Sequence, residues 1–355
     1  MLELYGFHGL QRHKVDEASA GDIVVFSGIE RLGISDTLCA PDHEEALPAL
    51  TVDEPTVSMT FQVNKSPFAG QDGKYLTSRQ IRERLDQELK HNVALRVDNT
   101  DDPDKFRVSG RGELHLAVLV ETMRREGFEL AVSRPEVIMH DVDGEEHEPW
   151  EQLTVDFDEE YQGAVMTRLA ERKGELADML PDGKGRIRLD YRIPTRGLIG
   201  FRTEYLTATS GTGLIYHVFE KYAPRVGGSI AQRNNGVLVS NVQGKALAYA
   251  LFNLQERGRL FIGHGAPVYE GMIIGIHQRS NDLVVNPTKA KQLTNIRAAG
   301  SDENLVLSPP IKYSLEQSLE FLDDDELLEI TPGSLRLRKK TLKESDRKRE
   351  SRQAS

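Results

Sequence analysis

The chain has 355 residues, of which 38% are hydrophobic and 28% charged, with a mean hydropathy of −0.46; this length suits two to three domains. No run of about 18 consecutive apolar residues occurs, so the sequence predicts no membrane-spanning helix. The first ten residues lack the basic segment of a secretory signal, and we expect none. The single cysteine, Cys39, excludes an internal disulfide and a multi-cysteine metal site. Together these features predict a cytoplasmic protein.

The net charge of −11 is unevenly distributed. Residues 1–185 carry a net charge of −18, residues 186–300 of +9, residues 301–330 of −8 and residues 331–355 of +6. One strongly basic block in an acidic chain favours a modular protein that presents one face to a polyanion. The alternative is an uneven surface whose charges are merely solvated.

Residues 1–50 contain short apolar runs, at 2–4 and 23–26, separated by polar turns. These strands are too few to close a barrel and remove its edges. We therefore expect this segment to be the end of a β-barrel.

Residues 51–137 then alternate between strand and helix patterns. Apolar residues at period two predict a strand at 57–63, and Ile81, Leu85 and Leu89 share one face of a helix. Thr77 and Gln80 have the spacing of a capping box at the start of that helix. Further strands are expected at 93–97, 106–108 and 128–132, with a helix at 112–126. The order βαββαβ is typical of a ferredoxin-like domain.

The same order repeats in residues 148–223, with a short helix expected at 197–208 and a strand at 213–219. From residue 224 to 335 glycine-rich β segments predict a mainly-β domain, interrupted by helices near 244–253 and 314–321. A polar, basic stretch at 286–304 has no apolar periodicity and is expected to be a long loop. The run from residue 335 is expected to begin as a strand and to end as a disordered basic tail, which is assigned to residues 336–355. The fold class is therefore α+β.

Catalytic motifs are missing from the sequence. No G-x-x-x-x-G-K-[ST] loop exists, and Asn64-Lys65-Ser66-Pro67 lacks the Asp of a guanine-reading motif. Gly110-Arg111-Gly112 lacks the third glycine of a dinucleotide fingerprint, and the ten histidines show no H-E-x-x-H pattern. We expect no metal and no catalytic residues, so a free-standing enzyme is disfavoured.

Basic, glycine-rich elements recur in the +9 block and favour RNA binding, because Arg and Lys contact phosphates while Asn and Gln can read bases or sugars. Arg196 and Arg202 have an alternative, structural role, in which they bracket the short helix of the second ferredoxin-like unit and pair with its neighbours. The candidate RNA-binding residues are Lys289, Lys291, Gln292, Asn295, Arg297, Arg233, Asn234, Lys245, Arg196 and Arg202.

A family resemblance follows from longer segments. The run VSGRGELHLAVLVETMRREGFEL at 108–130 resembles domain III of translational GTPases. With the segments at 53–85, 192–213, 235–263 and 285–303, the whole chain resembles the TypA/BipA family of ribosome-binding GTPases, which are similar to elongation factor G.

The resemblance implies an architecture. Residues 1–50 would be the end of a domain II-like barrel, 51–137 domain III-like, 148–223 domain V-like, and 224–335 the C-terminal domain specific to the family. GTP and Mg²⁺ would bind an N-terminal domain that precedes these residues, so we expect a C-terminal fragment with no cofactor of its own and no GTPase activity.

The resemblance also implies partners. These are the ribosome, with both subunits contacted at the factor-binding site, its rRNA, and the A-site tRNA, which the 286–304 loop would approach. Family roles lie in translation regulation, stress adaptation, virulence regulation and large-subunit assembly. We expect a monomer that does not bind membranes. The alternative function is a protein-interaction scaffold without direct RNA contact, docking through the acidic 1–185 half.

Overall fold

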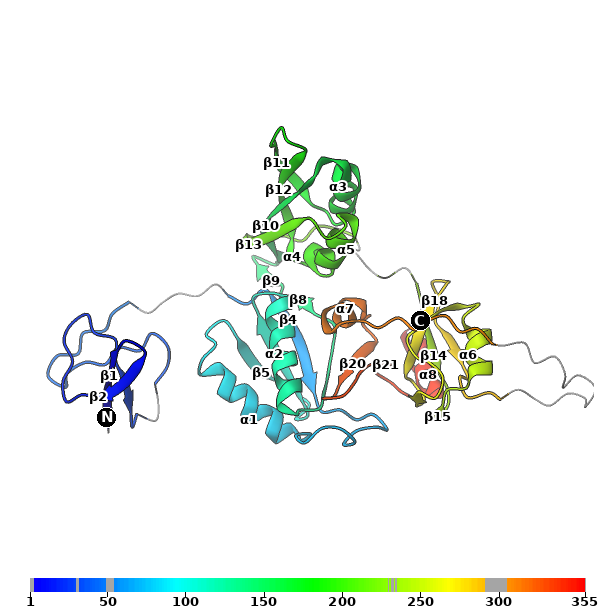
Figure 1. Cartoon of the computed structure of the whole chain (residues 1–355), viewed down its shortest axis with the longest axis horizontal. Coiled ribbons are helices and arrows are strands. Elements are labelled where there is room, and N and C mark those ends of the chain that lie inside the picture. Colours follow the sequence, from blue (N-terminus) through cyan, green and yellow to red (C-terminus); the bar gives the residue numbers. More distant parts are fainter. Residues whose placement is uncertain are drawn as a thin grey trace, which may run out of the picture. The chain divides into compact units, whose positions relative to one another are not determined.

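A computed structural model describes residues 3–29, 32–48, 54–228, 230, 233, 235–290 and 305–354 (Figure 1). The chain divides into two compact units, Met1–Val52 with Gln87–Val93, and Asp53–Asp86 with Ala94–Ser355. Among the described residues no helix is both long enough and apolar enough to cross a membrane.

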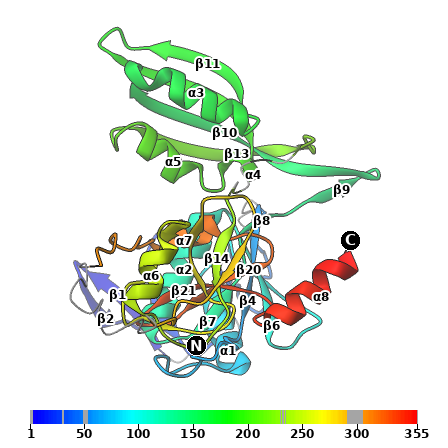
Figure 2. The ribbon, with the colours of Figure 1, turned by 90° about the vertical axis from the view of Figure 1, so that its right-hand side faces the viewer.

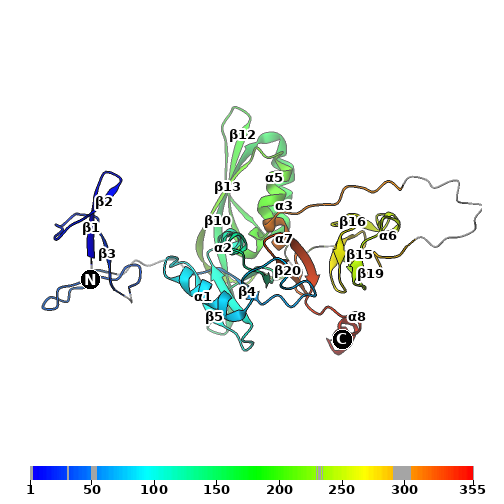
Figure 3. The same cartoon turned by 60° about the horizontal axis from the view of Figure 1, so that its bottom comes forward.

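The described part of residues 1–50 forms one antiparallel sheet in the order β2-β1-β3 (Figure 3). Its strands are β1 (Glu3–His8), β2 (Gln11–Lys14) and β3 (Val25–Ser27). Strand β2 is polar and exposed throughout, which is why apolar patterning does not predict it. Within the described residues these strands do not close a barrel.

Residues 54–137 form a ferredoxin-like sheet with strand order β7-β4-β6-β5. The elements are β4 (Val57–Gln62), α1 (Ser78–Leu89), β5 (Arg96–Asn99), β6 (Lys105–Gly110), α2 (Glu113–Glu126), β7 (Leu130–Val132) and β8 (Glu136–Val137). Buried Met59 and Phe61 alternate with the partly exposed Thr60 and Gln62, so β4 has one apolar and one polar face. Thr77 and Gln80 form the predicted capping box, through Thr77 N–H to Gln80 Oε1 (3.1 Å) and Gln80 N–H to Thr77 Oγ1 (3.3 Å).

A distant hairpin extends this sheet to the order β21-β20-β7-β4-β6-β5. Strand β20 (Glu326–Ile330) pairs with β7, with Leu328 opposite Val132, and β21 (Leu335–Lys339) pairs with β20. The hairpin of the predicted C-terminal domain therefore belongs to the sheet of the predicted domain III-like segment.

The prediction that residues 336–355 are disordered is wrong for the described residues 336–354. They contain most of β21 and helix α8 (Glu344–Ala354). Backbone pairing and burial of Leu337, Arg338 and Lys339 order the strand. The helix begins where Glu344 N–H donates to Glu270 Oε1 (3.0 Å).

Residues 140–224 form the second ferredoxin-like sheet, with strand order β11-β12-β10-β13 and helices α3 and α5 on one side (Figure 2). The elements are β9 (His140–Val142), β10 (Glu145–Asp158), η1 (Glu159–Tyr161), α3 (Gln162–Glu171), β11 (Glu175–Pro181), β12 (Arg186–Pro194), α4 (Thr195–Leu198), α5 (Phe201–Ala208) and β13 (Leu214–Pro224). The predicted helix at 197–208 is two helices, because Gly200 adopts a left-handed φ of 73° between them.

The remaining residues are mainly β, as predicted. One sheet has the order β16-β18-β14-β19, and β15 pairs with β17. The elements are β14 (Val237–Ser240), β15 (Gly244–Lys245), α6 (Ala248–Leu254), β16 (Gly258–Leu260), β17 (Pro267–Val268), β18 (Ile273–His277), β19 (Leu283–Val285) and α7 (Leu315–Phe321). Strands approach closely here: a Cβ on Gly258 would lie 1.9 Å from the Ile276 carbonyl oxygen, so only glycine fits.

Candidate nucleic-acid interface

Two of the predicted lysines, Lys245 and Lys289, lie at one edge of the C-terminal β domain. Both side chains are exposed. The segments that carry them are adjacent, because Leu247 N–H donates to the Pro287 carbonyl (2.9 Å) and Asn241 N–H to the Val285 carbonyl (3.0 Å). The structure thus brings together two segments whose lysines are 44 positions apart in the sequence.

His264 belongs to the same edge and was not predicted. Its exposed ring accepts a hydrogen bond at Nδ1 from Ala248 N–H (3.2 Å), at the start of α6. Gly265 N–H and Ala246 N–H bind the facing carbonyls of Ala246 and Ala266 (2.8 and 2.9 Å). Residues 263–266 therefore lie beside Ala246, the residue that follows Lys245. The only sequence signal for His264 was its place in the basic block, because isolated histidines carry no motif. We call Lys245, His264 and Lys289 the basic edge.

Arg196 has internal partners. Its Nη2 donates to Glu148 Oε1 (3.1 Å) and its Nη1 to the Gly228 carbonyl (3.0 Å), with a further bond to the Val226 carbonyl. Glu148 is completely buried, and the side chain of Arg196 is 14% exposed. These contacts match the structural role that the sequence left open for Arg196.

Arg233 is similarly occupied. Its Nη1 and Nη2 bind the two carboxylate oxygens of the buried Glu326 (2.9 and 2.8 Å), and its Cζ lies 4.4 Å from the ring centroid of Phe321. A bidentate pair of this kind occupies the two N–H donors that would otherwise bind a phosphate. Arg233 therefore joins the segment before β14 to α7 and β20.

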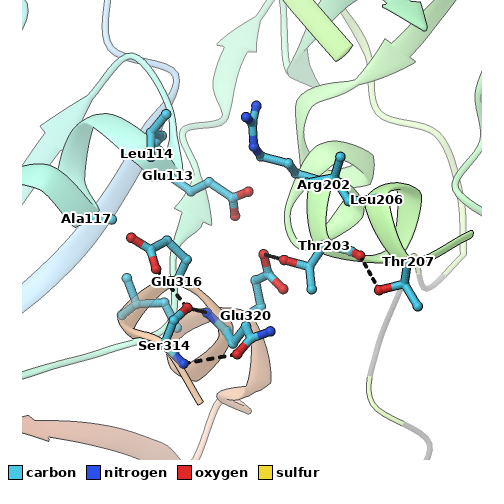
Figure 4. Close-up of a pocket in the computed structure, with 12 residues that line it drawn as sticks. Glu113, Leu114, Ala117, Arg202, Thr203, Leu206, Thr207, Ser314, Glu316 and Glu320 are labelled. Atoms are coloured by element: carbon cyan, nitrogen blue, oxygen red, sulfur yellow. Dashed lines mark hydrogen bonds between the residues drawn. The ribbon is translucent and has the colours of Figure 1, made fainter. Parts of the chain in front are cut away.

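Arg202, on α5, is exposed and lines a cavity of about 540 Å³ bounded by α2, α5 and α7. Figure 4 shows the Glu113 and Glu320 carboxylates pointing into this cavity, and Thr203 Oγ1 donates to Glu320 Oε1 (2.8 Å). Three acidic side chains and one arginine line the cavity, so it offers a phosphate a single cationic partner.

The surroundings of this cavity raise the pKa values of two of its acidic side chains. Burial raises the pKa of Glu320 to about 7, and the neighbouring Glu113 carboxylate raises it as well. Burial also raises the pKa of Glu113, although Gly200 N–H donates to its Oε2 (3.3 Å) and opposes the change. A carboxyl group that is partly protonated near neutral pH can act as a hydrogen-bond donor or as a proton-linked contact.

The other predicted RNA-binding residues, Asn234, Lys291, Gln292, Asn295 and Arg297, lie outside the described residues. Within the described part of the chain, no group of three or more His, Cys, Asp or Glu side chains is arranged to hold a metal ion.

Comparison with known proteins connects these domains to a family. Residues 235–344 match the model of the TypA/BipA C-terminal domain, and residues 145–233 match that of the elongation factor G C-terminus. The second match covers the β11-β12-β10-β13 sheet, and the first covers the basic edge and the hairpin β20–β21.

Curated relatives are similar over almost the whole chain. Proteins named large ribosomal subunit assembly factor BipA from Haemophilus influenzae and from Escherichia coli strain K12 are each 63% identical over 99% of this chain. The protein of that name from Salmonella typhimurium is 63% identical over 97%. The chain spans 57–58% of the length of these relatives. The resemblance to the TypA/BipA family is thus confirmed, and residues 235–344 are a TypA/BipA C-terminal domain.

Proposed function

We propose that this chain is a non-catalytic, ribosome-binding part of a TypA/BipA-like translation factor that docks RNA through the basic edge. Its close relatives are named for assembly of the large ribosomal subunit, and the matched domains are those of translation factors. The observation that carries the RNA-binding proposal is that exposed Lys245 and Lys289 lie on hydrogen-bonded neighbouring segments at the start of the 286–304 stretch.

The chemistry of the basic edge suits a nucleic-acid backbone. Exposed ammonium groups contact phosphates without reading bases, and such contacts position a protein on RNA. No carboxylate within the described residues forms an ion pair with Lys245 or Lys289, so neither has to break one to bind a phosphate. Arg196 and Arg233, in contrast, would have to give up buried carboxylates.

The finer parts of the proposal follow the family resemblance. The partners would be rRNA and the A-site tRNA region, with both ribosomal subunits contacted, and the chain would act as a cytoplasmic monomer. Stress adaptation and virulence regulation would be downstream consequences. GTP hydrolysis would belong to the whole protein, with GTP and Mg²⁺ held outside this chain.

Cosedimentation with ribosomes at two salt concentrations tests the proposal. The wild-type chain is expected to cosediment at low salt and to lose affinity steeply as salt rises, since phosphate contacts release counterions. The double variant K245A/K289A should weaken binding and flatten the salt slope of log affinity by about 0.7–0.9 per lost contact. Lys312→Ala, an exposed lysine away from the basic edge, serves as the matched control.

The scaffold alternative makes a different prediction. A protein-interaction scaffold that docks through its acidic half would keep its affinity in K245A/K289A. Equal affinities and equal salt slopes for wild type and the double variant would refute RNA docking at the basic edge.

A further inference from the structure

A recess of about 460 Å³ lies over the polar face of the sheet that contains β4, β7, β20 and β21. Thr60 and Gln62 supply its floor from β4, on the face opposite to the buried Met59 and Phe61. Its walls come from the turn before β6, from β20 and β21, and from the segment after β21. The charged residues that line it are Lys65, Asp102, Asp104, Lys105, Arg338 and Lys340.

Arg338 is the unusual member of this set. Its relative exposure is only 3%, yet no carboxylate among the described residues forms an ion pair with it. Its Nη1 donates to the Lys339 carbonyl (3.1 Å), whereas its Nε is buried with no hydrogen-bond partner. The nearby Glu329 is already bound by Arg336, Tyr269, Asn64 and Ser66. Burying a charge without a partner is costly, so this guanidinium indicates a missing anion.

The remaining charges of the recess leave it positive. Lys65 pairs with Asp104 (2.7 Å), and Lys105 pairs with Asp102 (3.2 Å). Arg338 and the exposed Lys340 are left without a carboxylate partner in the described part of the chain. Two cations, one buried and one at the solvent side, thus face the same space.

We propose that this recess binds a small phosphate-bearing anion, with Arg338 as its inner ligand and Lys340 as its outer one. A guanidinium offers paired N–H donors that match two oxygens of a phosphate. Lys340 supplies a second positive charge to a dianion, and the Thr60 hydroxyl and Gln62 amide, which also line the recess, add polar contacts. This site lies outside the basic edge and does not depend on the proposed ribosome contact.

The depth of Arg338 favours a terminal phosphate over an RNA backbone. Because Arg338 is only 3% exposed, its guanidinium is reached only by a group that can enter the recess, as a free phosphate or phosphomonoester can. A backbone phosphate carries a sugar on either side and suits an exposed ridge such as the basic edge. The volume of the recess falls within the range of small-ligand sites.

Isothermal calorimetry of the full chain with inorganic phosphate, in phosphate-free buffer, tests the site. We expect saturable binding at one site in the wild type. Arg338→Met keeps the volume but removes the donors, and should weaken binding by on the order of ten- to hundredfold. Lys340→Ala, at an exposed position, should weaken it severalfold, whereas Lys343→Ala, exposed and outside the recess, should leave it unchanged.

Thermal denaturation separates binding from folding. Phosphate should raise the melting temperature of the wild type and not that of Arg338→Met, while the variant should be at least as stable as the wild type without phosphate, because it no longer buries an unpaired charge. Unaltered phosphate binding in both Arg338→Met and Lys340→Ala, or no saturable binding in the wild type, would overturn the proposal. Displacement of phosphate by a short 5′-hydroxyl RNA would overturn the choice of a small anion.

Discussion

Arg233 and Lys245 carry the same charge in the same basic block, but they have opposite surroundings. Replacing Arg233 by Ala leaves the fully buried Glu326 with Lys339 (3.0 Å) as its remaining cationic partner. Leaving a buried charge with no partner costs about 3–5 kcal/mol. Because Glu326 keeps Lys339, the free energy of unfolding from urea titrations should fall by less than this, by about 1–3 kcal/mol, in Arg233→Ala.

Lys245→Ala is the matched control for Arg233→Ala. Exposed substitutions away from special features usually change stability by less than about 0.5 kcal/mol. If the two variants were equally stable, the ion pair between Arg233 and Glu326 would have no structural role. Arg233 would then return as a candidate RNA contact.

The sequence places these arginines and lysines in one basic block, but it does not show which of them are structural and which are accessible. The carboxylates that bind Arg196 and Arg233 lie 48 and 93 positions away, so no local sequence pattern predicts either ion pair. The segments that carry Lys245 and Lys289 come together only through backbone bonds between residues far apart in the sequence. Exposure and long-range pairing are properties of the packed chain, so charge counting alone mixed structural arginines with accessible lysines.

Glu320 makes stability depend on pH. Its folded pKa of about 7 lies above its ordinary value of 4.5, so the folded chain holds more protons than the unfolded chain between these values. Stability therefore falls as pH rises through this window. Glu320→Gln should abolish this loss, and its stability relative to wild type should increase by about 1–3 kcal/mol from pH 4.5 to pH 8.

Chemical denaturation at several pH values measures this difference. Glu113 from α2, Glu204 from α5 and Arg172 also act on the pKa of Glu320, so each variant is compared with wild type at the same pH. A difference between Glu320→Gln and wild type that stays constant from pH 4.5 to pH 8 would contradict a raised pKa of Glu320.

At the scale of elements, α7 depends on its first residue. Ser314 Oγ accepts from Gln317 N–H (3.3 Å), and Gln317 Oε1 accepts from Ser314 N–H (3.0 Å), which completes a capping box. Ser314→Ala should cost about 1 kcal/mol, because it leaves a helix donor without its acceptor. Thermal or urea unfolding, with exposed Ser308→Ala as the control, measures the loss. Equal stability of the two variants would argue against the cap.

Local patterns predicted the elements better than their partners. Period-two and helical spacing gave both βαββαβ orders, and Thr77 with Gln80 gave the cap of α1. The hairpin β20–β21 was harder, because its partner β7 lies about 200 positions earlier in the chain. The basic composition of residues 336–355 resembled a disordered tail, yet strand pairing and burial overrode composition there.

At the scale of the whole molecule, the chain has a net charge of −11 but carries two separate positively charged surfaces. The basic edge is exposed and suits a polymer of phosphates, whereas the recess around Arg338 is shielded and suits a single phosphate group. Net charge therefore predicts neither feature. The sign and depth of each local surface decide which anion it can take.

The chain should hydrolyse no GTP and should not distinguish guanine from adenine. Its sequence has no loop to cradle a triphosphate with Mg²⁺, and Asn64-Lys65-Ser66-Pro67 lacks the Asp that would read the base. Asn64 is instead buried and donates to the carboxylates of Glu129 (2.8 Å) and Glu329 (3.1 Å), so its amide is committed to the protein interior.

Phosphate binding at Arg338 would give GTP and ATP similar weak affinities, because that recess offers donors for phosphate and no base-specific contact. Calorimetry with each nucleotide, together with a phosphate-release assay, checks both statements. Saturable GTP binding that ATP cannot compete would show that this chain holds a guanine site that its motifs do not reveal.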